Sequence, residues 1–301
     1  MKKLLSALLT IGLSLATFKV FAAEPIKVDG SSTVFPITEA VAEEFGKQGG
    51  AKAMVGISGT GGGFKRFCRG ETDISDASRP IKQKEIDSCR EGAVAYTEFK
   101  IAMDGLAVVV NKDNDWVDYL TVEELKKIWE PGAQGVVTKW SQVRDGFPDQ
   151  EIQLFGPGTD SGTFDYFTEV INGKQSASRG DYTASEDDNV LVEGVASNPG
   201  GLGYFGLAYY EENQNKLKIV PIKSSGEAVV PSKETVLGGT YKPLSRPLFI
   251  YVSKEAWKNK PAVKQFVEYY IDHAAELSEE VGYVALPQNE YDNDVRKLKG
   301  M

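Results

Sequence analysis

Residues 26–45 read IKVDGSSTVFPITEAVAEEF, and this stretch indicates the fold class. A short strand, IKVD, is followed by a loop of glycine and hydroxyl residues, GSST, and then by an amphipathic segment. Ile37, Val41 and Phe45 recur at the i, i+4, i+8 spacing of one helical face. The stretch therefore predicts a strand–loop–helix unit whose loop is rich in hydrogen-bond donors.

The same design recurs twice further along the chain. Residues 51–70, AKAMVGISGTGGGFKRFCRG, and residues 151–171, EIQLFGPGTDSGTFDYFTEVI, each pass from a strand through a glycine- and hydroxyl-rich loop into a helix. Repeated strand–helix units are typical of α/β folds. Because 301 residues exceed the usual size of one domain, we expect two α/β domains.

Each of the three loops is a candidate anion-binding site. The first turn of a helix has unpaired backbone N–H groups, and the helix dipole adds partial positive charge there. Glycine lets the backbone approach a ligand closely, and Ser or Thr adds neutral O–H donors. Alternatively, Ser32, Thr60 and Ser161 only cap their helices. Three such loops in one chain favour a shared anion.

Two common functions are disfavoured by the motifs. GTGGGFKR lacks the third glycine of the dinucleotide motif and the Gly-Lys-Ser/Thr ending of a P-loop, so we expect no nucleotide. Ser161 lies between an aspartate and a glycine, as the nucleophile of trypsin-like proteases does, but a serine nucleophile needs a base. The sole histidine, His273, lies in the last amphipathic segment, and nothing ties it to Ser161. We therefore interpret Ser161 as a donor and do not expect an enzyme.

A carboxylate and a guanidinium follow the second loop, in residues 71–81, ETDISDASRPI. Asp76 would repel a bare anion, but an ionised carboxylate can accept the proton that phosphate carries near neutral pH. Arg79 offers a planar guanidinium suited to phosphate oxygens. The alternative is a surface Asp–Arg pair of little energetic consequence. The preferred hypothesis makes both residues ligands.

The chain begins with MKKLLSALLTIGLSLATFKVFAAEP, the pattern of a secretory signal peptide cut before Ala23. Removing residues 1–22 takes away three lysines and no acid, so the formal net charge goes from −9 to −12. An acidic chain without a stripe of Lys or Arg is not expected to bind nucleic acid. An anionic ligand must therefore be held by local donors.

Cys68 and Cys89 are the two cysteines of the chain. An even number of cysteines in an exported protein predicts one disulfide. Two cysteines and one histidine cannot build a common zinc site, so we expect no metal and no other cofactor.

Six motifs together resemble the periplasmic phosphate-binding proteins of bacterial ABC importers, the PstS type. In chain order they are DGSSTVFPI, GISGTGGGFKRFCRGETDISDASRPI, DGLAVVVN, LTVEELKKIW, GPGTDSGTFDYF and RPLFIYV. The likeness covers most of the chain after the signal peptide. It implies a two-lobed periplasmic binding protein fold of type II, in which each α/β lobe is a sheet flanked by helices and the ligand lies in the cleft between the lobes.

The resemblance also implies a set of ligand contacts. By position, phosphate is expected to meet the following residues: Ser32, Thr33, the Val34 amide, Ser58, Thr60, Asp76, Ser161, Gly162 and Thr163. Many members of the family carry an arginine just ahead of the Ser-Gly-Thr loop, where this chain has Pro157. We predict that Arg79 supplies the missing guanidinium.

We expect residues 23–105 and 248–301 to form lobe I and residues 106–247 to form lobe II, with DGLAVVVN and RPLFIYV crossing between them. The resemblance implies a monomeric periplasmic receptor that binds inorganic phosphate with high affinity and delivers it to the permease subunits of an ABC importer. The alternatives are a receptor for another tetrahedral oxyanion, such as sulfate, and a secreted phosphatase or esterase.

Overall fold

The computed structural model describes residues 24–159 and 161–301, so the predicted signal peptide, residues 1–22, lies outside the described residues. The strands are β1 (Ile26–Gly30), β2 (Ala53–Ile57), β3 (Ile74–Ala77), β4 (Tyr96–Asn111), β5 (Leu120–Thr121), β6 (Gln153–Gly156), β7 (Thr183–Ala184), β8 (Gly201–Gly206), β9 (Leu217–Ile219), β10 (Ile222–Lys223) and β11 (Ser245–Ser253). The α-helices are α1 (Phe35–Lys47), α2 (Gly59–Phe67), α3 (Gln83–Glu91), α4 (Val122–Trp129), α5 (Gly162–Phe167), α6 (Asp188–Ser197), α7 (Leu207–Glu212), α8 (Lys233–Leu237), α9 (Lys254–Asn259), α10 (Pro261–Glu280) and α11 (Gln288–Lys299). Within the described ranges, no helix is long and apolar enough to cross a membrane.

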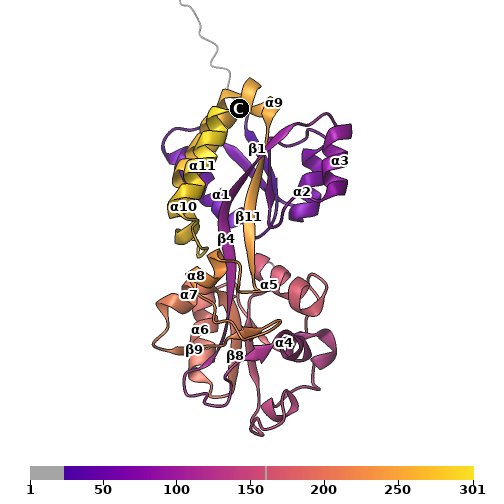
Figure 1. Ribbon diagram of the computed structural model, residues 1–301, viewed down its shortest axis with the longest axis vertical. Coiled ribbons are helices and arrows are strands. Elements are labelled where there is room, and N and C mark those ends of the chain that lie inside the picture. The colour runs from indigo at the N-terminus through magenta and orange to yellow at the C-terminus, as the bar shows by residue number, and fades with distance from the viewer. Residues whose placement is uncertain (1–23, 160) are drawn as a thin grey trace, which may run out of the picture.

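One mixed sheet, flanked by helices, organises the molecule (Figure 1). Its strand order is β2-β1-β3-β11-β4-β8-β6-β7, and β9 pairs with β4. The three predicted strand–helix units are confirmed, because β1 leads to α1, β2 to α2 and β6 to α5. β1 lies parallel to β2 and β3, so the loops that follow these three strands meet at one edge of the sheet. The predicted α/β class is therefore confirmed.

The long strands β4 and β11 run between two groups of helices (Figure 1). Helices α1–α3 and α9–α11 surround one end of this strand pair, and α4–α8 surround the other. β4 pairs with β11 as far as Gly105 and with β8 from Leu106 onward. This change of partner supports the proposed lobe boundary, and the division into lobes stays a prediction.

At the end of the molecule that carries α1–α3 and α9–α11, which we call the first end, the core is built around α1 and α10. Five side chains along one face of α10 are buried: Val263, Phe266, Val267, Tyr270 and Ala274. Phe45 of α1 packs edge-on against Phe266, with 5.4 Å between the ring centroids. Burial of this apolar surface fixes α1, and with it the loop that joins β1 to α1.

The glycines after β2 begin a helix, whereas the sequence predicted them to be loop. α2 starts at Gly59, so Thr60 and the next three glycines lie in its first two turns. A Cβ added to Gly63 would lie 2.6 Å from the Cα of Gly30. The glycine run therefore serves close packing of α2 against β1 as well as approach to a ligand.

The predicted disulfide is confirmed. Cys68, at the end of α2, is bonded to Cys89 of α3. Both cysteines are buried in a second core cluster with Phe64, Phe67 and Tyr251. The bond closes a chain segment with a sequence separation of 21 residues.

Replacing both cysteines by serine is expected to lower the free energy of unfolding by about 3 kcal/mol, because the unfolded chain regains the freedom that the loop closure removes. Denaturant unfolding of the wild type and the double variant measures the difference. Thiol titration of denatured, unreduced wild type should return no free cysteine. Two free thiols, or equal stability of the two proteins, would contradict the assignment.

Candidate functional site

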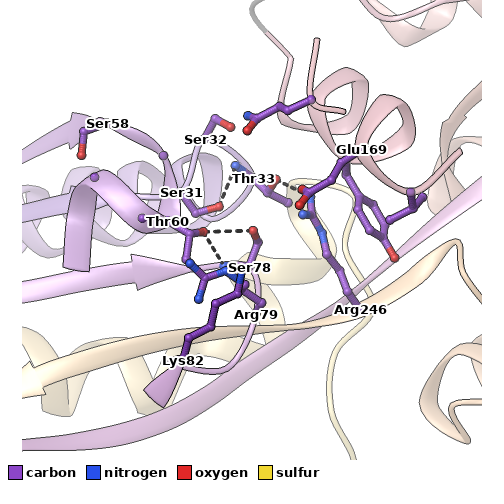
Figure 2. Close-up of a pocket in the computed structure, with 16 residues that line it drawn as sticks. Ser31, Ser32, Thr33, Ser58, Thr60, Ser78, Arg79, Lys82, Glu169 and Arg246 are labelled. Carbon is purple, nitrogen blue, oxygen red and sulfur yellow. Dashed lines mark hydrogen bonds between the residues drawn. The ribbon is translucent and has the colours of Figure 1, made fainter. Parts of the chain in front are cut away.

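A polar cavity of about 530 Å³ lies where loops from the two ends of the molecule meet (Figure 2). Its wall carries hydroxyl groups from Ser31, Ser32, Thr33, Ser58, Thr60 and Ser78, and cationic groups from Arg79, Lys82 and Arg246. Tyr166, Glu169, Val170 and Gln175 line it from the side of α5. We call this space the hydroxyl cavity.

The loop after β1 touches the start of α5 beside the hydroxyl cavity. Thr33 Oγ1 donates to the carbonyl oxygen of Gly162 at 3.3 Å. A Cβ added to Gly162 would lie 2.6 Å from the backbone nitrogen of Thr33, so only glycine permits this approach. Tyr283 donates its hydroxyl to the Thr33 carbonyl oxygen at 2.7 Å. The position of Thr33 is therefore fixed from two directions.

Hydrogen bonds within the wall orient the hydroxyl groups. Thr60 Oγ1 accepts from the backbone N–H of Ser78 at 3.1 Å and shares a second bond of 3.1 Å with Ser78 Oγ. Ser31 Oγ accepts from the backbone N–H of Thr33 at 3.2 Å. Because two hydroxyl groups that share one bond leave one O–H unused, the Thr60–Ser78 pair can still donate to a ligand.

Ser58 has a different role from Thr60, although both follow β2. Ser58 Oγ donates to Asp29 Oδ2 at 3.0 Å. The buried Asp29 carboxylate also accepts from Arg66 Nη1 at 2.5 Å. Ser58 therefore helps to hold the start of α2 in place, and its O–H is committed to Asp29.

The two guanidinium groups of the cavity are each paired with a carboxylate. Arg79 donates from Nη1 and Nη2 to the two oxygens of Glu85, at 2.9 and 2.7 Å. Arg246 donates from Nε to Asp104 Oδ2 at 3.2 Å. Apart from Lys82 and the carboxylate of Glu169, the wall therefore presents oriented donors with little excess local charge.

The predicted ligand residues fall into two groups around the contact between Thr33 and Gly162. Ser32, Thr33, Ser58, Thr60 and Arg79 line the hydroxyl cavity. Ser161, Gly162 and Thr163 line a neighbouring cavity, also of about 530 Å³, whose wall includes Ser32. Val34 is fully buried at the start of α1.

Ser161 is the N-cap of α5 in the structure, the alternative that its sequence left open. Its Oγ accepts from the backbone N–H of Thr163 at 3.2 Å. An accepting Oγ still carries its own O–H, so capping and donation to a ligand are compatible.

Asp76 is buried and is not among the residues that line the hydroxyl cavity. Its Oδ2 accepts from Thr38 Oγ1 at 2.9 Å, and that hydroxyl also contacts the hydroxyl of Tyr270 at 3.1 Å. Its Oδ1 has no hydrogen-bond partner among the described residues. Burial raises the pKa of Asp76 to about 7; the Thr38 bond opposes this rise and the nearby Asp29 charge adds to it. The carboxylate predicted to meet the ligand is thus directed between α1 and α10.

Sequence reasoning missed Ser78 and Arg246 as residues of the cavity. Both belong to the tripeptide Ser-Arg-Pro, which occurs at residues 78–80 and again at residues 245–247. β3 and β11 are antiparallel neighbours, so the end of one strand lies beside the start of the other and both arginines reach one cavity. The repeated tripeptide was the available signal, but RPLFIYV was interpreted only as a family motif and as a segment crossing between the lobes.

The chain matches the family model of the PBP superfamily domain (PBP_like_2) over residues 20–273. Protein SphX of Synechococcus elongatus is 54% identical over 268 residues, which cover 88% of this chain and 79% of that protein. The phosphate-binding protein PstS of Staphylococcus saprophyticus is 42% identical over 277 residues, which cover 91% of this chain and 84% of that protein.

Solved structures show the same fold. A possible phosphate-binding protein from Planctomyces limnophilus is 50% identical, with a TM-score of 0.88, and the match covers 92% of this chain and 98% of that one. An ABC-type phosphate transport receptor from Vibrio cholerae is 25% identical, with a TM-score of 0.65 over 87% of this chain and 100% of that one.

Asp76→Asn is expected to change how stability depends on pH. The folded protein keeps the Asp76 proton up to about pH 7, whereas the unfolded chain releases it near the ordinary value of 3.8. The free energy of unfolding of the wild type should therefore fall as the pH rises through this interval, by up to about 1.4 kcal/mol per pH unit from this group, and level off above it.

Denaturant unfolding of wild type and Asp76→Asn at pH 5 and pH 8 isolates this contribution, because all other groups are common to both proteins. The variant should gain stability relative to wild type at pH 8. The same difference at both pH values would show that the pKa of Asp76 is not raised.

Proposed function

The chain belongs to the PBP superfamily and, within it, to the PstS-type phosphate-binding proteins, and on this basis we propose that it binds inorganic phosphate and delivers it to an ABC-type phosphate importer. The hydroxyl cavity is the observation that carries the proposal. Its neutral O–H donors and carboxylate-paired guanidinium groups suit a small oxyanion whose oxygens each accept hydrogen bonds. In a chain with a formal net charge of −9, such local donors must outweigh the general repulsion of an anion.

We propose that Ser32, Thr33 and Thr60 bind the phosphate, with Ser78 acting through its shared bond with Thr60, and that the Thr33 hydroxyl exchanges its bond to the Gly162 carbonyl oxygen for one to the phosphate. The Val34 amide and residues 161–163 complete the set from the starts of α1 and α5. Because Ser32 lines both cavities, an anion bound at Ser32 lies within reach of both groups. The contact between Asp76 and the phosphate stays a proposal, because Thr38 engages only Oδ2 and Oδ1 has no hydrogen-bond partner among the described residues.

We also propose that the protein is a monomer exported to the periplasm after removal of residues 1–22, where it meets the permease subunits. The Cys68–Cys89 disulfide supports export, because such bonds persist in oxidising compartments. The names of the PstS relatives and of the Vibrio cholerae receptor support the role in transport.

The position of the histidine does not support the alternative function, a serine hydrolase. His273 stacks on Tyr269 of the same helix, with 3.9 Å between the ring centroids. Its Nδ1 lies 2.9 Å from the Tyr269 carbonyl oxygen. His273 lines neither of the two cavities, so it does not serve as a base for Ser161.

Calorimetric titration of protein that has been unfolded and refolded to remove bound ligand tests the proposed function. Phosphate should bind with a stoichiometry of one, and sulfate should bind more weakly. A chromogenic phosphate ester incubated with the same sample should show no turnover. Tighter binding of sulfate would favour the receptor for another oxyanion, and turnover of the ester would favour the hydrolase.

Phosphate is expected to draw the two ends of the molecule together, because the proposed ligand residues lie on both sides of the contact between Thr33 and Gly162. Ligand present at 1,000 times its dissociation constant should add about 4 kcal/mol to the free energy of unfolding. Small-angle scattering and thermal melts with and without phosphate measure the two effects. Curves and melting temperatures that do not respond to phosphate would argue against closure.

A further inference from the structure

Arg246 and Asp104 stand opposite each other in the strand pair that joins the two ends of the molecule. Arg246 is the second residue of β11, and its register partner on β4 is Asp104. Their ion pair measures 3.2 Å between Nε and Oδ2, and the Asp104 side chain is only 2% exposed. A carboxylate buried this deeply needs a partner, so the pair fixes the guanidinium in place.

The same guanidinium bridges the two sides of the site. Arg246 Nη2 donates to Thr33 Oγ1 at 2.6 Å and lies 3.4 Å from the carbonyl oxygen of Gly162. Its Cζ lies 3.6 Å from the centroid of the Tyr166 ring. Thr33 follows β1, whereas Gly162 and Tyr166 belong to α5. Arg246 therefore contacts both ends of the molecule from the strand between them.

The guanidinium retains donors for a ligand. The contacts with Asp104, Thr33 and Gly162 engage Nε and Nη2, and a guanidinium has five N–H donors in a planar fork. Figure 2 shows the Arg246 side chain entering the hydroxyl cavity beside Thr33. A phosphate oxygen at this point would meet the remaining N–H groups together with the hydroxyl groups of the wall.

Arg79 is less available, although it lines the same cavity. Both of its terminal nitrogens donate to Glu85, and Nη1 also donates to the carbonyl oxygen of Pro80 at 3.1 Å. Binding phosphate with Arg79 would require this bidentate pair to open. Arg246 needs no such rearrangement, because its carboxylate partner contacts only the Nε edge.

We propose that Arg246 is the guanidinium that binds the phosphate, and that Asp104 and Tyr166 are positioning residues that hold it at the junction of the two ends. The proposal rests on the proposed function and revises the assignment of Arg79. It makes the strand pair β4–β11 part of the binding site. The ligand is then bound by loops at both ends and by the segment that connects them.

Phosphate titration of refolded wild type, Arg246→Ala and Arg79→Ala tests this assignment, since both variants remove an arginine from one cavity. Arg246→Ala should weaken phosphate binding at least tenfold and reduce the phosphate-dependent rise in melting temperature at a fixed phosphate concentration. Arg79→Ala should weaken binding less than threefold. Unchanged affinity in Arg246→Ala, or a larger loss in Arg79→Ala, overturns the proposal. A wild type that does not bind phosphate would instead refute the proposed function.

Three further substitutions keep the test decisive if Arg246→Ala does not fold. Arg246→Lys retains the charge and loses the planar fork, so its phosphate affinity should fall several-fold, and wild-type affinity would overturn the proposal. Asp104→Asn should also weaken phosphate binding, and Asp104→Glu should recover part of the loss. A purely structural role for Asp104 predicts lower melting temperatures of both ligand-free variants with unchanged phosphate affinity.

Discussion

The antiparallel pairing of β4 with β11 is the constraint on which the rest of the structure depends. The part of β4 up to Gly105 pairs with β11, and the part from Leu106 onward pairs with β8. A single strand therefore belongs to both ends of the molecule. The polar cavity lies next to the same pair, because Arg246, the second residue of β11, lines its wall.

The balance of charge at the site follows from the same arrangement. Cross-strand pairing sets Asp104 opposite Arg246, and the turn after β3 sets Arg79 against Glu85. Each guanidinium keeps its hydrogen-bonding geometry while its charge is largely compensated. On the proposed assignment, an anion in this cavity would be held chiefly by directed O–H and N–H donors, which lose less to salt screening than exposed charges do.

Much of the fold could be predicted from local patterns. The order of the three strand–helix units and the disulfide depend on neighbouring residues or on residue counts, and the structure confirms them. The details of the site depend on long-range pairing. Asp76 Oδ2 accepts a hydrogen bond from Thr38, which is 38 residues away in the sequence. The Thr38 hydroxyl in turn contacts the hydroxyl of Tyr270, which is 232 residues away from Thr38. The role of Arg246 follows from the register of β11 against β4, which no local pattern encodes.

A crystal structure of the refolded protein with phosphate tests the central claim most directly. We predict one tetrahedral anion in the hydroxyl cavity, bonded to Thr33 and Thr60 and to the guanidinium of Arg246, while Arg246 keeps its ion pair with Asp104. An anion bound elsewhere, for example in the neighbouring cavity against Glu186 and Asp188, or bound in the hydroxyl cavity without contact to Arg246, would contradict the account.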